Sequence, residues 1–226
     1  MNVRVLLCAV LLAAVSLSVT GADARERAKP EPEAVQTYDP AKRYVFYLHG
    51  LYMDKRGPRG ETDYPGIHAA LEGMGFVLMD NIRGLLGNEG YAAQVAEEVD
   101  ALLEAGVPPG HITIAGHSKG GFIALIAASI IQNPKISYAV FGGCAVRGTR
   151  YRKRFVRFAN GDAENMRGRF VVAWARDDWV AEDCDDAMRN ASVTYRNVVL
   201  PGGLGPRTYY KPDDVWLDIL KEHALR

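Results

Sequence analysis

The sequence lacks a net charge, because 27 lysines and arginines balance 27 aspartates and glutamates over its 226 residues. Nucleic acids and anionic membranes select for basic proteins, so the overall balance points to neither as a partner. The sequence also lacks an internal repeat, a metal-ligand spacing and a dinucleotide-binding glycine fingerprint, so we expect no metal and no cofactor. What it has is 48% apolar residues, enough for one domain with a substantial core.

Cysteine is scarce, with three residues, and Cys8 lies within an apolar stretch near the N-terminus. Residues 1–24 have one basic residue, then this apolar stretch, then the small-residue ending Ala22-Asp23-Ala24. That order is typical of a secretory signal peptide cleaved after Ala24. The apolar stretch is short and no basic flank follows it, so we expect export to the periplasm or the extracellular space, with no stable membrane span after cleavage. A retained anchor helix is the alternative.

Removal of residues 1–24 would leave two cysteines, Cys144 and Cys184. An even pair in an exported chain predicts a disulfide, and two buried free thiols are the alternative. Residues 25–42 are rich in Arg, Glu, Lys and Pro and predict a flexible lead-in. The single folded domain is therefore expected at residues 43–226.

Within this domain, β-rich runs alternate with helical patterns. Most of the β-rich runs are continuously apolar, as in a parallel sheet covered on both faces. They are residues 43–50, 72–80, 111–116, 137–144, 168–178 and 191–203. Helical periodicity lies between and after them, at residues 67–74, 91–103, 120–133 and 212–224. The predicted fold class is α/β: a doubly wound, mostly parallel sheet of about six strands with helices on both faces.

Residues 145–169 depart from this alternation, because eight lysines and arginines there face only two acidic residues, Asp162 and Glu164. Such a segment is either a lid or anion-attracting rim beside an active site, or a solvated surface connection. The sequence leaves both interpretations open.

One short motif carries chemistry: Gly116-His117-Ser118-Lys119-Gly120 lies between a predicted strand and a predicted buried helix. A G-x-S-x-G sequence at such a corner is the nucleophile elbow, in which a strained turn exposes the serine hydroxyl. The N-terminal amides of the following helix favour developing negative charge at the same place. Ser118 is therefore the candidate nucleophile, and a structural glycine-rich turn is the alternative.

An acyl-transfer reaction also needs donors for the oxyanion of its tetrahedral intermediate. The amide of Lys119 directly follows the serine. A second amide, of Leu51 or Tyr52, follows the His49-Gly50 pair that ends the first predicted strand. We take Leu51 and Lys119 as the candidate donors and expect His49 to shape the loop rather than act as a base.

Three segments, YLHG (47–50), AGHSKGG (115–121) and ARDDWVAEDC (175–184), resemble those of the α/β-hydrolase superfamily, and more narrowly those of small exported bacterial hydrolases without a large cap domain. The resemblance spans about residues 43–220. It implies a serine nucleophile at Ser118, an acid after the next-to-last strand and a histidine in the loop after the last strand. Asp178 fits the acid position, with Asp177 as the alternative, and a solvent-exposed carboxylate without a catalytic role is also possible.

The expected histidine is missing. Similar proteins have glycine, histidine and glycine at about residues 205–207, where this sequence has Gly205-Pro206-Arg207. The arginine stays protonated and is no base. The chain has five histidines, none of them in this loop: His49, His68, His111, His117 and His223. Among unorthodox bases, Lys119 and His68 are the candidates.

The leading hypothesis is a serine hydrolase that acts on a small-molecule ester or related acyl bond, with Ser118 and Asp178 as catalytic residues and impaired activity. The alternative is a non-catalytic binding protein that uses the same pocket, with the arginine-rich segment contacting an anionic ligand or partner.

Overall fold

The structure is a computed structural model that describes residues 37–57, 60–79, 86–145, 148–203 and 205–226. The predicted signal peptide, Cys8 and most of the predicted lead-in lie outside these described residues. Among the described helices, none is both long enough and apolar enough to cross a lipid bilayer.

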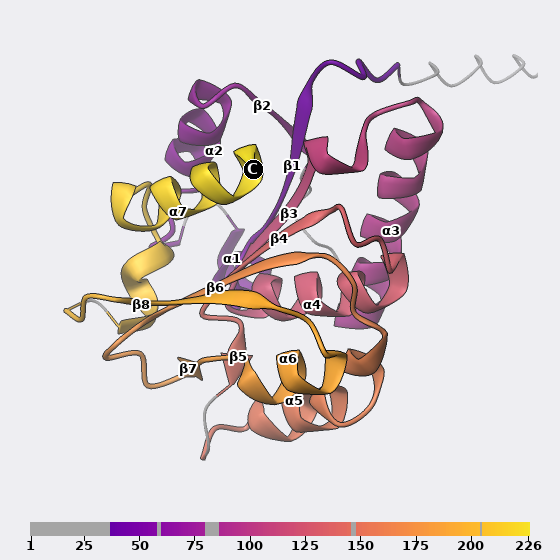
Figure 1. The fold of residues 1–226 in the computed structure, drawn as a ribbon. Coiled ribbons are helices and arrows are strands. Elements are labelled where there is room, and N and C mark those ends of the chain that lie inside the picture. The colour runs from indigo at the N-terminus through magenta and orange to yellow at the C-terminus, as the bar shows by residue number, and fades with distance from the viewer. Residues whose placement is uncertain (1–36, 58–59, 80–85, 146–147, 204) are drawn as a thin grey trace, which may run out of the picture. The chain divides into compact units, whose positions relative to one another are not determined.

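Six parallel strands form the central sheet, in the order β2-β1-β3-β4-β6-β8 (Figure 1). They are β1 (Arg43–Leu48), β2 (Phe76–Met79), β3 (Ile112–His117), β4 (Ser137–Phe141), β6 (Arg169–Ala175) and β8 (Tyr195–Leu200). Each lies within a predicted strand run or extends it by one residue. The strands β3 and β4 in the middle of the sheet are buried at every residue, which explains their continuously apolar sequences.

The two faces of the sheet bury two separate sets of side chains. Along β1, Tyr44 and Phe46 belong to one cluster of buried residues, and Val45 and Tyr47 belong to the other, as the alternation of a strand requires. The first cluster contains residues of α3 (Asn88–Glu104), α4 (Lys119–Ile131), α5 (Arg152–Ala159) and α6 (Asp185–Ala191). The second contains residues of α1 (Leu51–Arg56), α2 (Tyr64–Gly73) and α7 (Asp214–Leu225). Helices therefore cover both faces, and the predicted fold class is confirmed.

The arginine-rich segment that interrupts the alternation contains α5 and the short helix η3 (Asp162–Asn165). Two buried phenylalanines of α5, Phe155 and Phe158, pack edge-on against Phe122 of α4. The segment is thus attached to the core, and Lys153, Arg154 and Arg157 of α5 are exposed.

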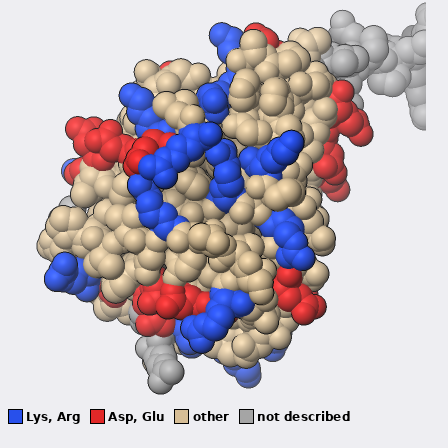
Figure 2. All heavy atoms as spheres, viewed as in Figure 1, with Lys and Arg blue, Asp and Glu red and all other residues tan. Residues whose placement is uncertain are grey.

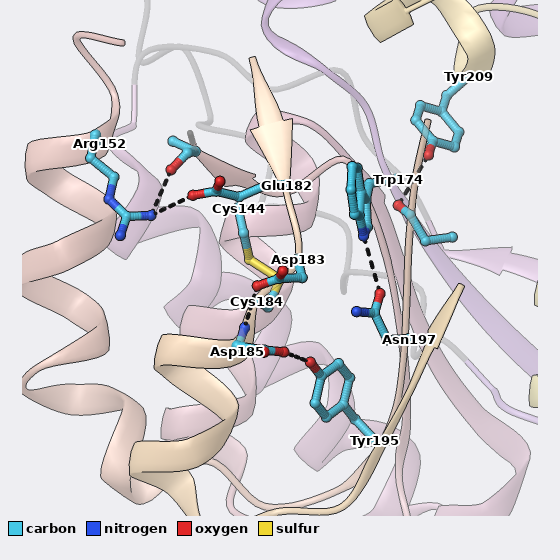
Figure 3. Close-up of a disulfide and its surroundings, with 12 residues drawn as sticks. Cys144, Arg152, Trp174, Glu182, Asp183, Cys184, Asp185, Tyr195, Asn197 and Tyr209 are labelled. Carbon is cyan, nitrogen blue, oxygen red and sulfur yellow. Dashed lines mark hydrogen bonds and ion pairs between the residues drawn. A yellow bond between two sulfur atoms is a disulfide. The ribbon is translucent and has the colours of Figure 1, made fainter. Parts of the chain in front are cut away.

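A two-stranded antiparallel ribbon, β5 (Cys144–Ala145) with β7 (Ala181–Glu182), was not predicted, because strands of two residues leave no periodic pattern. A disulfide between Cys144 and Cys184 joins this ribbon to the residue before α6 (Figure 3). The predicted disulfide is confirmed and the alternative of two free thiols is wrong. Arg152 adds bonds to Glu182 at 2.9 Å and to Asp186 at 2.8 Å, so it fastens α5 to the ribbon and α6.

Candidate active site

The predicted nucleophile lies at a sharp corner between β3 and α4. Ser118 adopts φ 53° and ψ −115°, a positive-φ conformation that few residues other than glycine adopt. Its amide donates a hydrogen bond of 2.8 Å to the carbonyl of Phe141, at the end of β4. This hydrogen bond fixes the corner against the neighbouring strand. The strained turn that the G-x-S-x-G motif predicts is present at Ser118.

Two glycines are required because the backbone is crowded there. A Cβ atom on Gly120 would lie 1.7 Å from the carbonyl oxygen of Leu48, at the end of β1. A Cβ atom on Gly116 would lie 2.3 Å from the carbonyl carbon of Gly120. Only glycine lets α4 begin this close to β1 and β3, and this approach places the start of α4 beside the loop after β1.

Ser118 lines an open cavity of about 790 Å³ at the carboxyl ends of the strands. Ligand sites of open α/β sheets lie at this end. The other walls of the Ser118 cavity come from the loop after β1, from α4 and α5, and from the loops after β6 and β8. These walls include Leu51, Tyr52, Lys119, Phe122, Gly143, Arg150, Tyr151, Arg154, Phe155, Trp179, Pro206, Arg207 and Tyr210.

The two predicted oxyanion donors begin two helices at this cavity. Leu51 is the first residue of α1, and Lys119 is the first residue of α4. Both residues line the cavity beside Ser118. Their role as donors stays a prediction, and the geometry brings the two residues to the same wall as the serine.

An ion pair holds these two helix starts together. Lys119 Nζ lies 2.5 Å from Asp54 Oδ2, and Asp54 Oδ1 lies 3.7 Å from Nδ1 of the buried His49. His49 also bonds to the carbonyl of Gly50 at 3.0 Å. This arrangement agrees with His49 as a residue that shapes the loop. The ion pair directs Lys119 Nζ to Asp54, and no hydrogen bond between described residues joins it to Ser118, which argues against Lys119 as the base.

The two adjacent aspartates after β6 have different partners. Asp177 accepts hydrogen bonds from the amides of Gly203 at 2.7 Å and of Gly205 at 3.2 Å, so it holds the loop after β8. Asp178 Oδ1 accepts from the amides of Val180 at 2.8 Å and Ala181 at 3.0 Å. No hydrogen bond to Asp178 Oδ2 comes from the described part of the chain, so this oxygen has the capacity to orient an imidazole.

Asp178 is also electrostatically perturbed. Burial raises the pKa of the Asp178 carboxyl above its usual range, the two amide hydrogen bonds oppose this rise, and the charge of Asp177 adds to it. A carboxyl group with a raised pKa at the end of a strand is typical of a functional position. Of the two aspartates, Asp178 is therefore the better candidate acid.

The loop after β8 lacks a base in structure as in sequence. It forms the short helix η4 (Gly205–Tyr209). A Cβ atom on Gly205 would lie 2.5 Å from the Trp179 ring, so a side chain has no room there. Pro206 and Arg207 line the cavity, and Arg207 Nε lies 3.1 Å from Glu61. Pro206, the position at which similar proteins have the histidine, thus lines the same cavity as Ser118.

No histidine lies in the loop after β8, where the base is expected. Between described residues, which include all five histidines, no hydrogen bond joins an imidazole to the Ser118 hydroxyl. His117 is buried, with its ring centroid 5.0 Å from that of Tyr209, and His68 packs 4.0 Å from Tyr64 and does not line the cavity. His111 precedes β3 at the opposite end of the sheet. His223 bonds to the carbonyl of Arg169 at that same end, and burial lowers its pKa to about 4.

The cavity carries positive charge that the neutral overall composition hides. Among the described residues, no Asp or Glu lines it and four cationic residues do: Lys119, Arg150, Arg154 and Arg207. Three of these have carboxylate partners outside the lining. Arg150 instead donates to the hydroxyl of Tyr151 at 2.7 Å and stacks on that ring, with no carboxylate partner in the described part of the chain.

Sequence reasoning missed the aromatic walls of the cavity. Trp179, which is 67% exposed, lies on the cavity wall, and the rings of Tyr52 and Tyr210 lie 5.8 Å apart at its edge. The tryptophan directly follows the candidate acid, which was the one signal available. The two tyrosines are far apart in sequence, and no local pattern predicts that they meet.

A scan of protein-family models finds no match to this sequence, and a search of curated proteins finds none. Solved structures match in fold. SOBER1 of Arabidopsis thaliana is 16% identical with a TM-score of 0.57, over 81% of this chain and 98% of that chain. An esterase/lipase from an uncultured bacterium is 12% identical with a TM-score of 0.54, over 82% of this chain and 78% of that chain. Acetyl xylan esterase 1 from Thermoanaerobacterium sp. is 12% identical with a TM-score of 0.52, over 81% and 74% of the respective chains. At these identities the likeness is one of fold.

Proposed function

We propose, from the premise that this chain has the α/β-hydrolase fold, that it is a serine hydrolase that acts on small-molecule esters or related acyl compounds through an acyl-enzyme. The observation that carries the proposal is the strained Ser118 at the open cavity, next to the first residues of α1 and α4. A backbone strain of this kind persists where the surrounding structure imposes it, and it clusters at functional sites.

In the proposed reaction, Ser118 Oγ attacks the acyl carbon and the amides of Leu51 and Lys119 bind the resulting oxyanion. The serine proton passes to water or hydroxide in the cavity, because no imidazole of the described residues bonds to the hydroxyl. The C–O bond to the leaving group then breaks and leaves an ester on Ser118. A water molecule attacks this ester, the acid is released and the serine regains a proton.

The missing base sets the expected rate. Removal of the base from a serine triad lowers kcat by roughly 10⁴ to 10⁶, and the oxyanion donors and substrate binding retain roughly 10³ to 10⁴ over water. We therefore expect a slow hydrolase that prefers activated esters, whose leaving groups depart without protonation.

A second candidate function is a binding protein without catalytic activity. Two observations on the described residues favour it: no histidine bonds to Ser118, and the cavity lining has four cations and no carboxylate. Under this alternative the cavity would hold an anionic ligand and Ser118 would be a hydrogen-bonding group.

Reaction with a fluorophosphonate separates the two functions. The hydrolase should form one covalent adduct per chain on Ser118, slowly and faster at higher pH. Ser118→Ala should abolish the adduct. Ser129→Ala is the matched control, because it removes a buried hydroxyl from the same helix and should leave labelling unchanged. A folded protein that is never labelled over the whole pH range in which it stays folded would establish the binding protein instead.

We also propose export, which the sequence of residues 1–24 supports. Expression with its own N-terminus in a bacterial host, followed by fractionation and N-terminal sequencing, should yield a mature chain that begins at Arg25. A cytoplasmic chain that still carries Met1 would contradict this.

A further inference from the structure

A second cavity, of about 570 Å³, lies at the opposite end of the sheet from Ser118. Arg169 is the first residue of β6 and Arg196 the second of β8, whereas Ser118 follows the carboxyl end of β3. Of the residues that the structure describes, no Asp or Glu lines this cavity and four arginines do: Arg167, Arg169, Arg196 and Arg226. Figure 2 shows Lys and Arg side chains gathered on this face of the molecule, around the end of α7.

Several guanidinium N–H groups in this cavity are buried without a partner among the described residues. They are Nε and Nη2 of Arg196 and Nε of Arg169. The remaining groups are bonded: Arg196 Nη1 lies 2.7 Å from Glu222 Oε2, and Arg169 Nη2 donates to Ser137 Oγ at 2.6 Å. A buried donor left without an acceptor costs about 1 to 3 kcal/mol, so the cluster is arranged for an acceptor that the described side chains do not supply.

The side-chain charges around the cavity are also unbalanced. Glu222 forms ion pairs with both Arg196 and Arg226, and these contacts lower the pKa of Glu222, so it stays ionised. Arg167 donates to two carbonyls, those of Glu164 at 2.8 Å and Met166 at 2.7 Å. Among the described residues, Glu222 is thus the one carboxylate that pairs with any of the four arginines, and it pairs with two of them.

We propose that this cluster is a binding site for the phosphate group of a small phosphate monoester, separate from the active-site cavity. Nε–H and Nη2–H of one guanidinium donate in parallel, which matches two oxygens of a phosphate, and Arg169 Nε–H provides a third donor from the adjacent strand. The cavity is much larger than a phosphate ion and has apolar walls at Phe170 and Val193, which would contact the organic part.

Calorimetric titration of the full chain with methyl phosphate and with inorganic phosphate, at constant ionic strength, tests this site. Saturable binding of one phosphate per chain is expected. Arg196→Gln and Arg169→Gln should each weaken it about tenfold or more, because each removes charge-assisted hydrogen bonds. Arg196→Lys, which keeps the charge and loses the paired donors, should weaken binding nearly as much. Arg157→Gln removes an exposed arginine elsewhere and is the matched control.

Two further measurements keep the test decisive. Ser118→Ala should bind phosphate as the parent chain does, which separates this site from the proposed hydrolase site. Sedimentation with phosphatidylcholine vesicles, with and without phosphatidic acid, identifies the source of the phosphate. Vesicle binding that needs both Arg196 and phosphatidic acid indicates a lipid headgroup. Binding of methyl phosphate without binding to vesicles indicates a soluble ester. No saturable binding of any of these probes, or equal binding by a folded Arg196→Gln variant, overturns the proposal.

Discussion

The corner after β3 and the loop after β8 line the same cavity. The corner has the residues expected of a serine-hydrolase site, whereas the loop lacks the expected histidine. The corner has every backbone feature expected of a serine nucleophile with oxyanion donors. Ser118 is strained, Gly116 and Gly120 are crowded, and two helices begin beside them. The loop after β8 is held in place by Asp177, yet it presents a proline and an arginine to the cavity.

This difference shows which half of a serine-hydrolase site depends on the backbone. Under the proposed function, the positions of the nucleophile and its oxyanion donors are set by backbone geometry, which the close packing of β1, β3 and α4 maintains. The base is one side chain on a surface loop, and a single substitution removes it without changing the fold. A chain with this architecture can therefore keep the machinery for acylation and lose the machinery for rapid turnover.

The largest expected effect comes from filling the crowded corner. Gly120→Ala would place a Cβ atom 1.7 Å from the Leu48 carbonyl, so we expect a loss of roughly 3 kcal/mol or more, or no folded protein. Gly110→Ala is the matched control, because nothing lies within 4 Å of its added Cβ atom. Urea unfolding of both variants measures the difference. Equal stability of the two would contradict the close packing on which the elbow depends.

The next effect concerns the disulfide beside the acid. Cys144→Ser with Cys184→Ser opens a link across a sequence separation of 40 residues, which should lower the free energy of unfolding by about 4 kcal/mol in the chain-entropy model. Denaturant unfolding under non-reducing conditions checks this value. A stability unchanged from that of the parent would show that β5 and α6 hold the acid loop without the covalent link.

Restoring a base should repair the incomplete loop. Pro206→His places an imidazole in the cavity lining and should raise the hydrolysis of an activated ester about tenfold or more. The added activity should level off above about pH 7, where imidazole is neutral. Lys211→His, which adds the same side chain outside the lining, is the control and should give no gain.

The Asp178→Asn variant of the Pro206→His chain should lose most of that gain, because the imidazole loses its orienting carboxylate. A folded Pro206→His protein without added activity, or a gain that persists with Asp178→Asn, would contradict the assignment of acid and base positions.

The smallest expected effect is on stability at the acid. The pKa of Asp178 is higher in the folded than in the unfolded state. Ionisation of this carboxyl therefore lowers the free energy of unfolding, and the loss develops as pH rises from the unfolded-state pKa through the folded-state pKa. Asp178→Asn keeps an acceptor for the two amides and should raise the melting temperature slightly at neutral pH, with no gain at about pH 3, where the carboxyl is protonated in both states. Asp177→Asn weakens bonds to Gly203 and Gly205 and should lower the melting temperature instead.

Local patterns in the sequence predicted most of the fold and located the strained corner at Ser118. The apolar runs indicated the strands because the inner strands of the sheet are almost entirely buried, and the glycine spacing located the corner because backbone crowding constrains residue type. Side chains that meet from distant elements left no such signal. The pairing of Lys119 with Asp54, the aromatic wall at Tyr52 and Tyr210, and the arginine cluster at the far end of the sheet depend on tertiary structure.

Mass spectrometry of the chain after reaction with p-nitrophenyl acetate tests the central claim most directly. If the backbone alone makes Ser118 a nucleophile, one acetyl group should accumulate on Ser118, because its removal by water lacks a base. The rate of its formation should rise with pH without a plateau near pH 7. A folded chain that carries no acetyl group on Ser118, at any pH at which the fold persists, would contradict this account.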